Sequence, residues 1–99
     1  MAKRGELNRA LCSEITDRRK LAGLTQKDMF TRAGIDKNVY RRMEYNKHTV
    51  SVEELEAVAE ALGVSANELL AAAQQRRDRA DVAPMSRAAR EWRGALGFD

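Results

Sequence analysis

Short stretches with helical spacing, separated by residues that end helices, are the feature that most limits how this chain can fold. Apolar residues recur three and four positions apart, and few stretches alternate apolar and polar residues as a strand would. Gly23, Gly34, Asn46 and Gly63 fall between these stretches, and all four can adopt the left-handed backbone conformation that ends a helix. The sequence therefore predicts an all-α fold of five short helices.

The first half of the chain carries the signals for three of these helices. The first helix ends at Gly23, whereas Thr25 and Asp36 can cap a second helix over residues 26–32 and a third from residue 37 to residue 45. The side chains expected to face the core from the three helices are Leu11, Cys12, Ile15, Ala22, Met29, Phe30, Ala33, Tyr40 and Met43. Val39 lies at the edge of that face and is not assigned to it.

Two later helices begin with the Ser-x-x-Glu pattern of a capping box, formed by Ser51 with Glu54 and by Ser65 with Glu68. The helix after Ser51 carries four apolar residues at helical spacing, namely Leu55, Val58, Ala59 and Leu62. The helix after Ser65 runs at least to residue 73 and can continue into the Arg-rich residues that follow. We therefore divide the chain into a compact domain over residues 1–75 and a tail over residues 76–99.

The tail has its own pattern. Pro84 interrupts any helix that precedes it, and an amphipathic segment can start again at Ser86. Trp92 falls on the apolar side of that segment, where it could either anchor a partner or pack against the domain. Both readings of Trp92 stay open.

Charge is divided unevenly along the chain. Residues 1–50 carry twelve Lys or Arg against six Asp or Glu, whereas residues 51–75 carry five Glu and no basic residue. A chain polarised in this way could turn its basic half toward a polyanion such as a nucleic acid. The plain alternative is an uneven, fully solvated surface.

Other kinds of chemistry have little support. His48 and Cys12 are the single histidine and the single cysteine, too few for a zinc site, so no metal or cofactor is expected. No nucleotide-binding fingerprint or nucleophile triad is present, and we expect no enzymatic activity. One cysteine cannot form an internal disulfide, and the chain has no apolar run of the length that spans a bilayer and no apolar leader. These features favour a cytoplasmic protein in which Cys12 fills the core.

Residues 34–47, "GIDKNVYRRMEYNK", form the second half of a helix-turn-helix pattern, in which two short helices are joined by a glycine-bearing turn. Five apolar positions can hold the two helices together, namely Met29, Ala33, Ile35, Tyr40 and Met43. The second helix therefore buries only a narrow stripe. Its remaining surface is basic and polar, which suits a groove of DNA.

The chain resembles the Cro/phage-repressor-type (XRE-like) helix-turn-helix family over about residues 11–70. The likeness runs through "RRKLAGLTQKDM", "AGIDKNVYRRMEYNK" and "SVEELEAVAEALGVSANELL". It includes Arg19 four residues ahead of "GLTQ", Gly34 in the turn and Glu44 near the end of the recognition helix. The chain departs from the family pattern at three positions: Phe30 replaces the usual Ala, Tyr40 the usual Ile or Val, and Asn46 the usual Gly.

The resemblance implies a five-helix, lambda-repressor-like domain over residues 1–75 that binds double-stranded DNA. By position, the base-contacting residues would be Lys37, Asn38, Val39, Arg41 and Arg42. The expected phosphate contacts are Gln26, Lys27, Lys47, His48, Thr49 and Ser51, together with backbone amides near Val50 and Ser51. The resemblance also implies an ion pair between Arg19 and Glu44.

A sequence-specific transcriptional repressor of the phage-immunity or Cro type is the function that follows. We expect such a protein to bind its operator as a homodimer, through the helix around residues 67–73 and the Trp92 segment. The alternative is an antitoxin-type interaction module whose tail, residues 76–99, binds a protein partner. A tail that pairs two copies of this chain favours the first function, and a tail that orders on a foreign protein favours the second.

Overall fold

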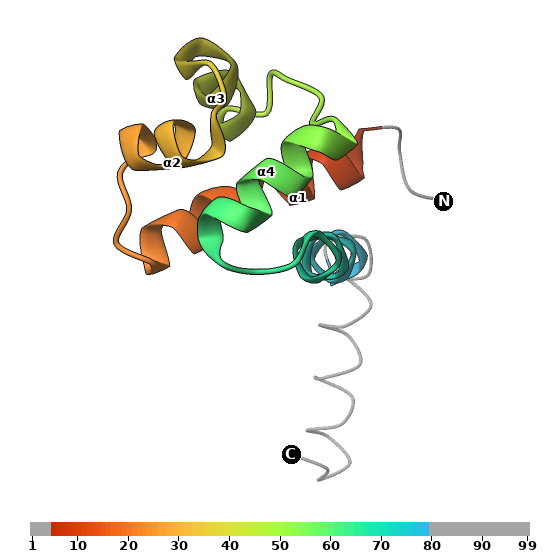
Figure 1. The fold of residues 1–99 in the computed structure, drawn as a ribbon. Coiled ribbons are helices and arrows are strands. Elements are labelled where there is room, and N and C mark those ends of the chain that lie inside the picture. Colours follow the sequence, from red (N-terminus) through yellow and green to blue (C-terminus); the bar gives the residue numbers. More distant parts are fainter. Residues whose placement is uncertain (1–4, 80–99) are drawn as a thin grey trace, which may run out of the picture.

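The computed structural model describes residues 5–79, and every regular element in that range is a helix (Figure 1). The helices are α1 (Glu6–Leu21), α2 (Gln26–Ala33), α3 (Lys37–Glu44), α4 (Val52–Leu62) and a last helix that covers residues 66–79 of the described part. The predicted all-α fold is confirmed. The last helix continues past residue 73 into the Arg-rich stretch, whereas the expectations for Pro84 and Trp92 lie outside the described residues.

Local side chains set where the helices begin. Thr25 Oγ1 accepts a hydrogen bond from the Asp28 N–H, and the Asp28 carboxylate accepts one from the Thr25 N–H, so α2 starts with a complete capping box. Ser51 and Glu54 form the predicted box at the start of α4. Asp36 caps α3 by accepting from the N–H groups of Asn38 and Val39.

One predicted cap is only half formed. Ser65 Oγ accepts from the Glu68 N–H at 3.0 Å, as expected, but the Glu68 carboxylate extends to Arg18 Nη1 at 2.6 Å. A charged partner on α1 is thus used by the side chain that was expected to complete the box. The helix still begins at the predicted place because the serine supplies the essential acceptor.

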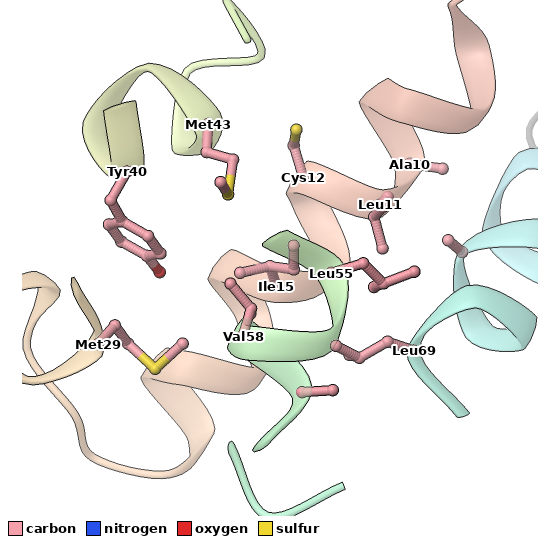
Figure 2. Close-up of a cluster of buried hydrophobic side chains, with 12 residues drawn as sticks. Ala10, Leu11, Cys12, Ile15, Met29, Tyr40, Met43, Leu55, Val58 and Leu69 are labelled. Atoms are coloured by element: carbon pink, nitrogen blue, oxygen red, sulfur yellow. The ribbon is translucent and has the colours of Figure 1, made fainter. Parts of the chain in front are cut away.

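The core lies between α1 and α4, with α2 and α3 on one side and the last helix on the other (Figures 1 and 2). The buried residues are Ala10, Leu11, Cys12, Ile15, Met29, Tyr40, Met43, Leu55, Val58, Ala59, Leu69 and Ala73. Cys12 fills the core as predicted, and burial raises the pKa of its thiol to about 11, so the thiol stays protonated. Among residues 5–79, no helix has the length and apolarity that a membrane span requires.

Four expected core positions are less buried than predicted. Ala22 is exposed because it caps α1 beyond the last helical turn, where the chain has already left the core face. Phe30, Ala33 and Leu62 are partly buried and pack against the core. By contrast, Tyr40 is fully buried, so the aromatic side chain at this position lies in the interior.

Candidate nucleic-acid interface

Helix α3 separates its two faces sharply. Tyr40 and Met43 are fully buried, and Figure 2 shows both extending from α3 toward the other helices. Four side chains are exposed on the rest of the helix, namely Lys37, Asn38, Arg41 and Arg42, and Val39 is half-buried between the two faces. Three of the four exposed groups are cations, so α3 presents a positive surface to solvent.

The turn before α3 fixes where this surface begins. Gly34 ends α2 with a φ of 67°, and its N–H bonds the Thr31 carbonyl. A residue with a side chain would be strained there, because the left-handed region favours glycine. Asp36 then caps α3, and its carboxylate accepts from backbone N–H groups of the helix. The first turn of α3 itself contains no acidic residue.

Glu44, the acidic residue of α3, faces inward and joins three helices. Its carboxylate accepts hydrogen bonds from Arg19 Nε at 2.7 Å, Gln26 Nε2 at 2.9 Å and Tyr40 Oη at 2.5 Å. The Arg19 side chain is 12% exposed and that of Glu44 is 5% exposed. The structure therefore brings Arg19 and Glu44 together, with α1, α2 and α3 each contributing to one buried cluster.

The charge states in this cluster follow from its contacts. Burial alone would raise the pKa of Glu44, but hydrogen bonds from Arg19, Tyr40 and Gln26 outweigh it, and the pKa is lowered. Burial, followed by the hydrogen bond to Glu44, raises the pKa of Tyr40, so the phenol keeps the proton that it donates. Glu44 is thus an ionised acceptor at neutral pH, with donors from three residues.

The predicted phosphate contact at Gln26 has a partner inside the protein. Its side-chain N–H donates to Glu44, which leaves the amide oxygen and the second N–H of the same group for other partners. Lys27, the next residue, is exposed at the first turn of α2. Both residues lie near the N-terminus of α2, where the helix dipole favours an anion.

The loop of residues 46–50, between α3 and α4, is tied down by neighbouring side chains. The imidazole Nε2 of His48 lies 2.9 and 3.0 Å from the two carboxylate oxygens of Glu54. Lys47 and Thr49 are exposed on the same loop. Of the predicted phosphate contacts in this loop, Lys47 and Thr49 therefore have open side chains and His48 is engaged with α4.

The backbone N–H groups of Val50 and Ser51, which were expected near a phosphate, already donate to side chains within the protein. The Val50 N–H donates to Asn8 Oδ1 at 2.9 Å, and the Ser51 N–H donates to Glu54 Oε1 at 2.8 Å. The capping of α4 and the attachment of the loop to α1 take both donors. The Ser51 hydroxyl accepts from the Glu54 N–H and retains its own proton for a further partner.

The contacts that Tyr40 and Asn8 make at this interface were not predicted from the sequence. Tyr40 and Glu44 are four residues apart on one helix, a spacing that could have indicated their contact. Asn8 contacts residues 46–50 from about forty positions earlier in the chain, and no local pattern signals such a pairing. Within the described part of the chain, no three acidic, histidine or cysteine side chains are grouped as metal ligands would be.

Comparisons with known proteins agree with this geometry. A family model described as Helix-turn-helix matches residues 15–69, which span the second half of α1, the complete α2–α3 unit and α4. A similar solved structure is that of the clp gene regulator ClgR from Corynebacterium glutamicum, with a TM-score of 0.70 and 25% sequence identity. That likeness covers 90% of this chain and 93% of the other. A comparison with curated proteins gives no match.

The resemblance drawn from the sequence is therefore confirmed. The family match and the structural likeness together support a DNA-binding transcriptional regulator.

Proposed function

Because this chain belongs to the helix-turn-helix family of the Cro/phage-repressor type, we propose that it represses transcription by reading one DNA sequence in the major groove with α3. The observation that carries the proposal is the outer face of α3. Lys37, Asn38, Arg41 and Arg42 are exposed there, while the acid of the same helix, Glu44, is turned inward and neutralised by Arg19. Binding, and not catalysis, is the proposed activity.

Each exposed side chain of α3 suits a base edge. Lys and Arg can donate to the paired acceptors of guanine, and Asn38 can make the bidentate contact that adenine offers. Val39, half-buried beside them, could touch a thymine methyl group. Lys37 and Asn38 lie in the first turn of α3, the part of a recognition helix that contacts base edges.

Phosphate contacts would frame the recognition helix on both sides. Lys27 and the free atoms of the Gln26 amide are offered from α2, and Lys47, Thr49 and the Ser51 hydroxyl are offered after α3. His48 would act beside them while it is held by Glu54. Such contacts fix the register of the protein on the duplex but do not read sequence.

We propose a homodimer as the DNA-bound form, working at the nucleoid in the cytoplasm. One α3 reads only a few base pairs, and two half-sites about one helical turn apart supply further discrimination. Leu69 and Ala73 are buried within the protomer and are not available to a partner copy. Asn67 and Ala71 are exposed on the same helix and could contact one. A dimer placed on a promoter represses by excluding the polymerase.

The test begins with the full chain and a random duplex library. Selected sequences should share a motif with two related half-sites, and the mass of the complex should correspond to two copies of the chain. The selected site, placed within a promoter, should lower transcription in a purified system when the protein is added. A rise in transcription would contradict the repressor role, and the absence of any shared motif would contradict sequence-specific binding.

Variants distinguish reading from simple attraction. Asn38→Ala or Arg42→Ala should cost about 1–3 kcal/mol on the selected site and relax the preference at one base pair. Lys47→Ala is the matched control. Loss of a phosphate contact should weaken binding to all sequences about equally and reduce the slope of log K against log salt concentration by about one. If the α3 variants behave like Lys47→Ala, α3 is an electrostatic surface and does not read bases.

A further inference from the structure

The side chain of Asn8, on α1, is bonded to three points of the loop of residues 46–50. Asn8 Nδ2 donates to the Asn46 side-chain oxygen at 3.1 Å and to the His48 carbonyl at 3.0 Å. Asn8 Oδ1 accepts from the Val50 N–H at 2.9 Å. One amide thus bridges a helix and a loop that are 38 to 42 residues apart in the sequence.

The three partners require an amide in one orientation. The Val50 N–H can only donate, so an oxygen must face it, whereas the His48 carbonyl can only accept, so an N–H must face that side. A carboxylate would place an acceptor against the His48 carbonyl, and a hydroxyl is too short to reach both ends of the loop. Asparagine is therefore matched to this loop by both chemistry and size.

The loop has further anchors at its two ends. Asn46 holds the left-handed conformation, with a φ of 56°, and the Lys47 N–H bonds the Arg42 carbonyl at 2.8 Å. At the other end, Glu54 bonds both the His48 ring and the Ser51 N–H. Asn8 holds the stretch between these anchors, and it does so from α1.

The backbone held in this way carries Lys47 and Thr49, whose side chains are exposed. A loop ordered before binding loses less conformational entropy when its side chains engage a ligand. Ordering the backbone of one residue costs roughly a tenfold change in an equilibrium constant. Loss of the Asn8 contacts would therefore weaken the phosphate contacts of the loop and lower the affinity for DNA, although Asn8 itself need not contact a phosphate.

We propose that Asn8 is a positioning residue for DNA binding, which holds the loop of residues 46–50 in the conformation that contacts the phosphate backbone. This inference rests on the proposed function. It assigns to α1, outside the helix-turn-helix unit, a share in affinity but none in the choice of bases. The effect of Asn8 must then pass through the exposed groups of the loop, above all Lys47.

The experiment compares Asn8→Ala with Ser13→Ala, a small polar-to-alanine change on the same helix outside this network. Binding is measured on the selected duplex and on an unrelated duplex, far below the unfolding temperature of each variant. Asn8→Ala should weaken both complexes by about tenfold for each loop residue that must be ordered again. The preferred base at each position should stay the same, and Ser13→Ala should bind like the wild type.

A double-mutant cycle shows whether Asn8 acts through the loop. Lys47→Ala should cost less affinity in the Asn8→Ala background than in the wild type, by more than the roughly twofold scatter that independent sites show. A role in stability alone predicts unchanged affinity of the folded protein and additive effects. Either of these two results would overturn the inference while leaving the proposed function in place.

Amide hydrogen exchange of the free wild-type protein supplies a measurement that does not depend on the folding of a variant. The Val50 N–H should be protected, because it donates a hydrogen bond to Asn8 Oδ1. Exchange at the rate of an unprotected amide would overturn the inference. Wild-type protein that shows no salt-dependent binding to any duplex would instead overturn the proposed function, and the inference with it.

Discussion

Arg18 and Arg19 are neighbours in α1, yet they serve two very different ion-pair clusters. Arg19 turns toward the helix-turn-helix unit and pairs with Glu44, whose side chain is only 5% exposed. Arg18 turns toward the last helix and pairs with Glu14 at 2.7 Å and with Glu68 at 2.6 Å, where the Glu68 side chain is 52% exposed. The same pair of charged groups is thus placed once in the interior and once at the surface.

The surface cluster extends through Arg76. Its guanidinium lies 3.0 Å from the carboxylate of Glu14 and 2.8 Å from that of Asp17, which links the last helix to α1 a second time. Water and salt screen charges in such a position. The burial of Leu69 and Ala73 is therefore what holds the last helix, and the arginines adjust its orientation.

The N···O distances in the two clusters are nearly equal. The contribution of each ion pair to stability therefore depends on whether its surroundings are the interior or the surface. In the interior, each donor and acceptor needs a partner because water cannot replace a lost one. The Glu44 cluster must therefore stay intact for α1, α2 and α3 to pack, and so for α3 to present its basic face. The surface cluster can lose a member and be hydrated instead.

Removing the buried carboxylate should produce the largest effect. Glu44→Ala leaves Arg19 and Tyr40 without their partner, and breaking a buried pair in this way costs about 3–5 kcal/mol of unfolding free energy. Glu68→Ala is the matched control, and we expect it to cost at most about 1 kcal/mol. Urea unfolding of both variants measures the difference. Equal losses would show that the two clusters are equivalent.

Removing one donor to Glu44 should have an intermediate effect. Tyr40→Phe keeps the buried ring and deletes the hydroxyl that bonds the carboxylate, a charge-assisted contact worth about 1.5–3 kcal/mol. Tyr45→Phe deletes the same hydroxyl from a side chain that is 70% exposed and should change stability little. Thermal unfolding compares the two. A similar melting temperature for both variants would place the phenol of Tyr40 in contact with water.

Acid should weaken both clusters, the buried one more. The pKa of Glu44 and that of Glu14 are both lowered from 4.5 in the folded protein, although burial opposes each shift, because the donated hydrogen bonds of their partners outweigh it. A lowered pKa means stability that is present above pH 4.5 and is lost as the pH falls through the folded-state value.

Glu44→Gln should therefore flatten the acid limb of the stability curve more than Glu14→Gln does. Unfolding by urea between pH 2 and pH 6, roughly the window in which carboxylates titrate, measures both slopes. If Glu14→Gln reduced the pH dependence of the unfolding free energy more than Glu44→Gln, the surface cluster would be the more acid-sensitive of the two.

Breaking the surface cluster should have the smallest effect. Arg18→Ala removes the exposed pair with Glu68 and the partly buried pair with Glu14, and we expect a loss of about 0.2–1 kcal/mol that fades in concentrated salt. Glu14 keeps its contact with Arg76 in this variant, which limits the loss further. Unfolding in low and high salt tests the expectation. A loss that salt does not reduce would indicate that Arg18 acts by packing its aliphatic stem and not by its charge.

Much of the fold could be predicted because its signals are local. The caps at Thr25, Asp36 and Ser51 act within three residues, and Asn46 is a residue type that tolerates the left-handed conformation found there. Helical spacing then fixed which side of α3 is buried, and hence which side carries the exposed basic residues. The Arg19–Glu44 contact followed from family likeness and not from spacing.

The candidate site was less accessible to the same reasoning. The sequence gives no sign that Gln26 donates to Glu44, that Glu68 prefers Arg18 to its own cap, or that the Val50 amide is occupied. Each of these partners lies on another helix or loop. The choice among several polar side chains within reach depends on where the helices dock.

By itself, the sequence determined the helices, their ends, the helix-turn-helix unit and the separation of basic from apolar faces, because each depends on neighbours within about one or two helical turns. Only the tertiary structure decided that Arg18 pairs with Glu68 while Arg19 pairs with Glu44, and that Asn8 bonds the loop of residues 46–50. The bonds of Arg18 to Glu68, of Arg19 to Glu44 and of Asn8 to the loop join positions 25 to 50 residues apart, which come together only after the apolar faces of the helices have packed.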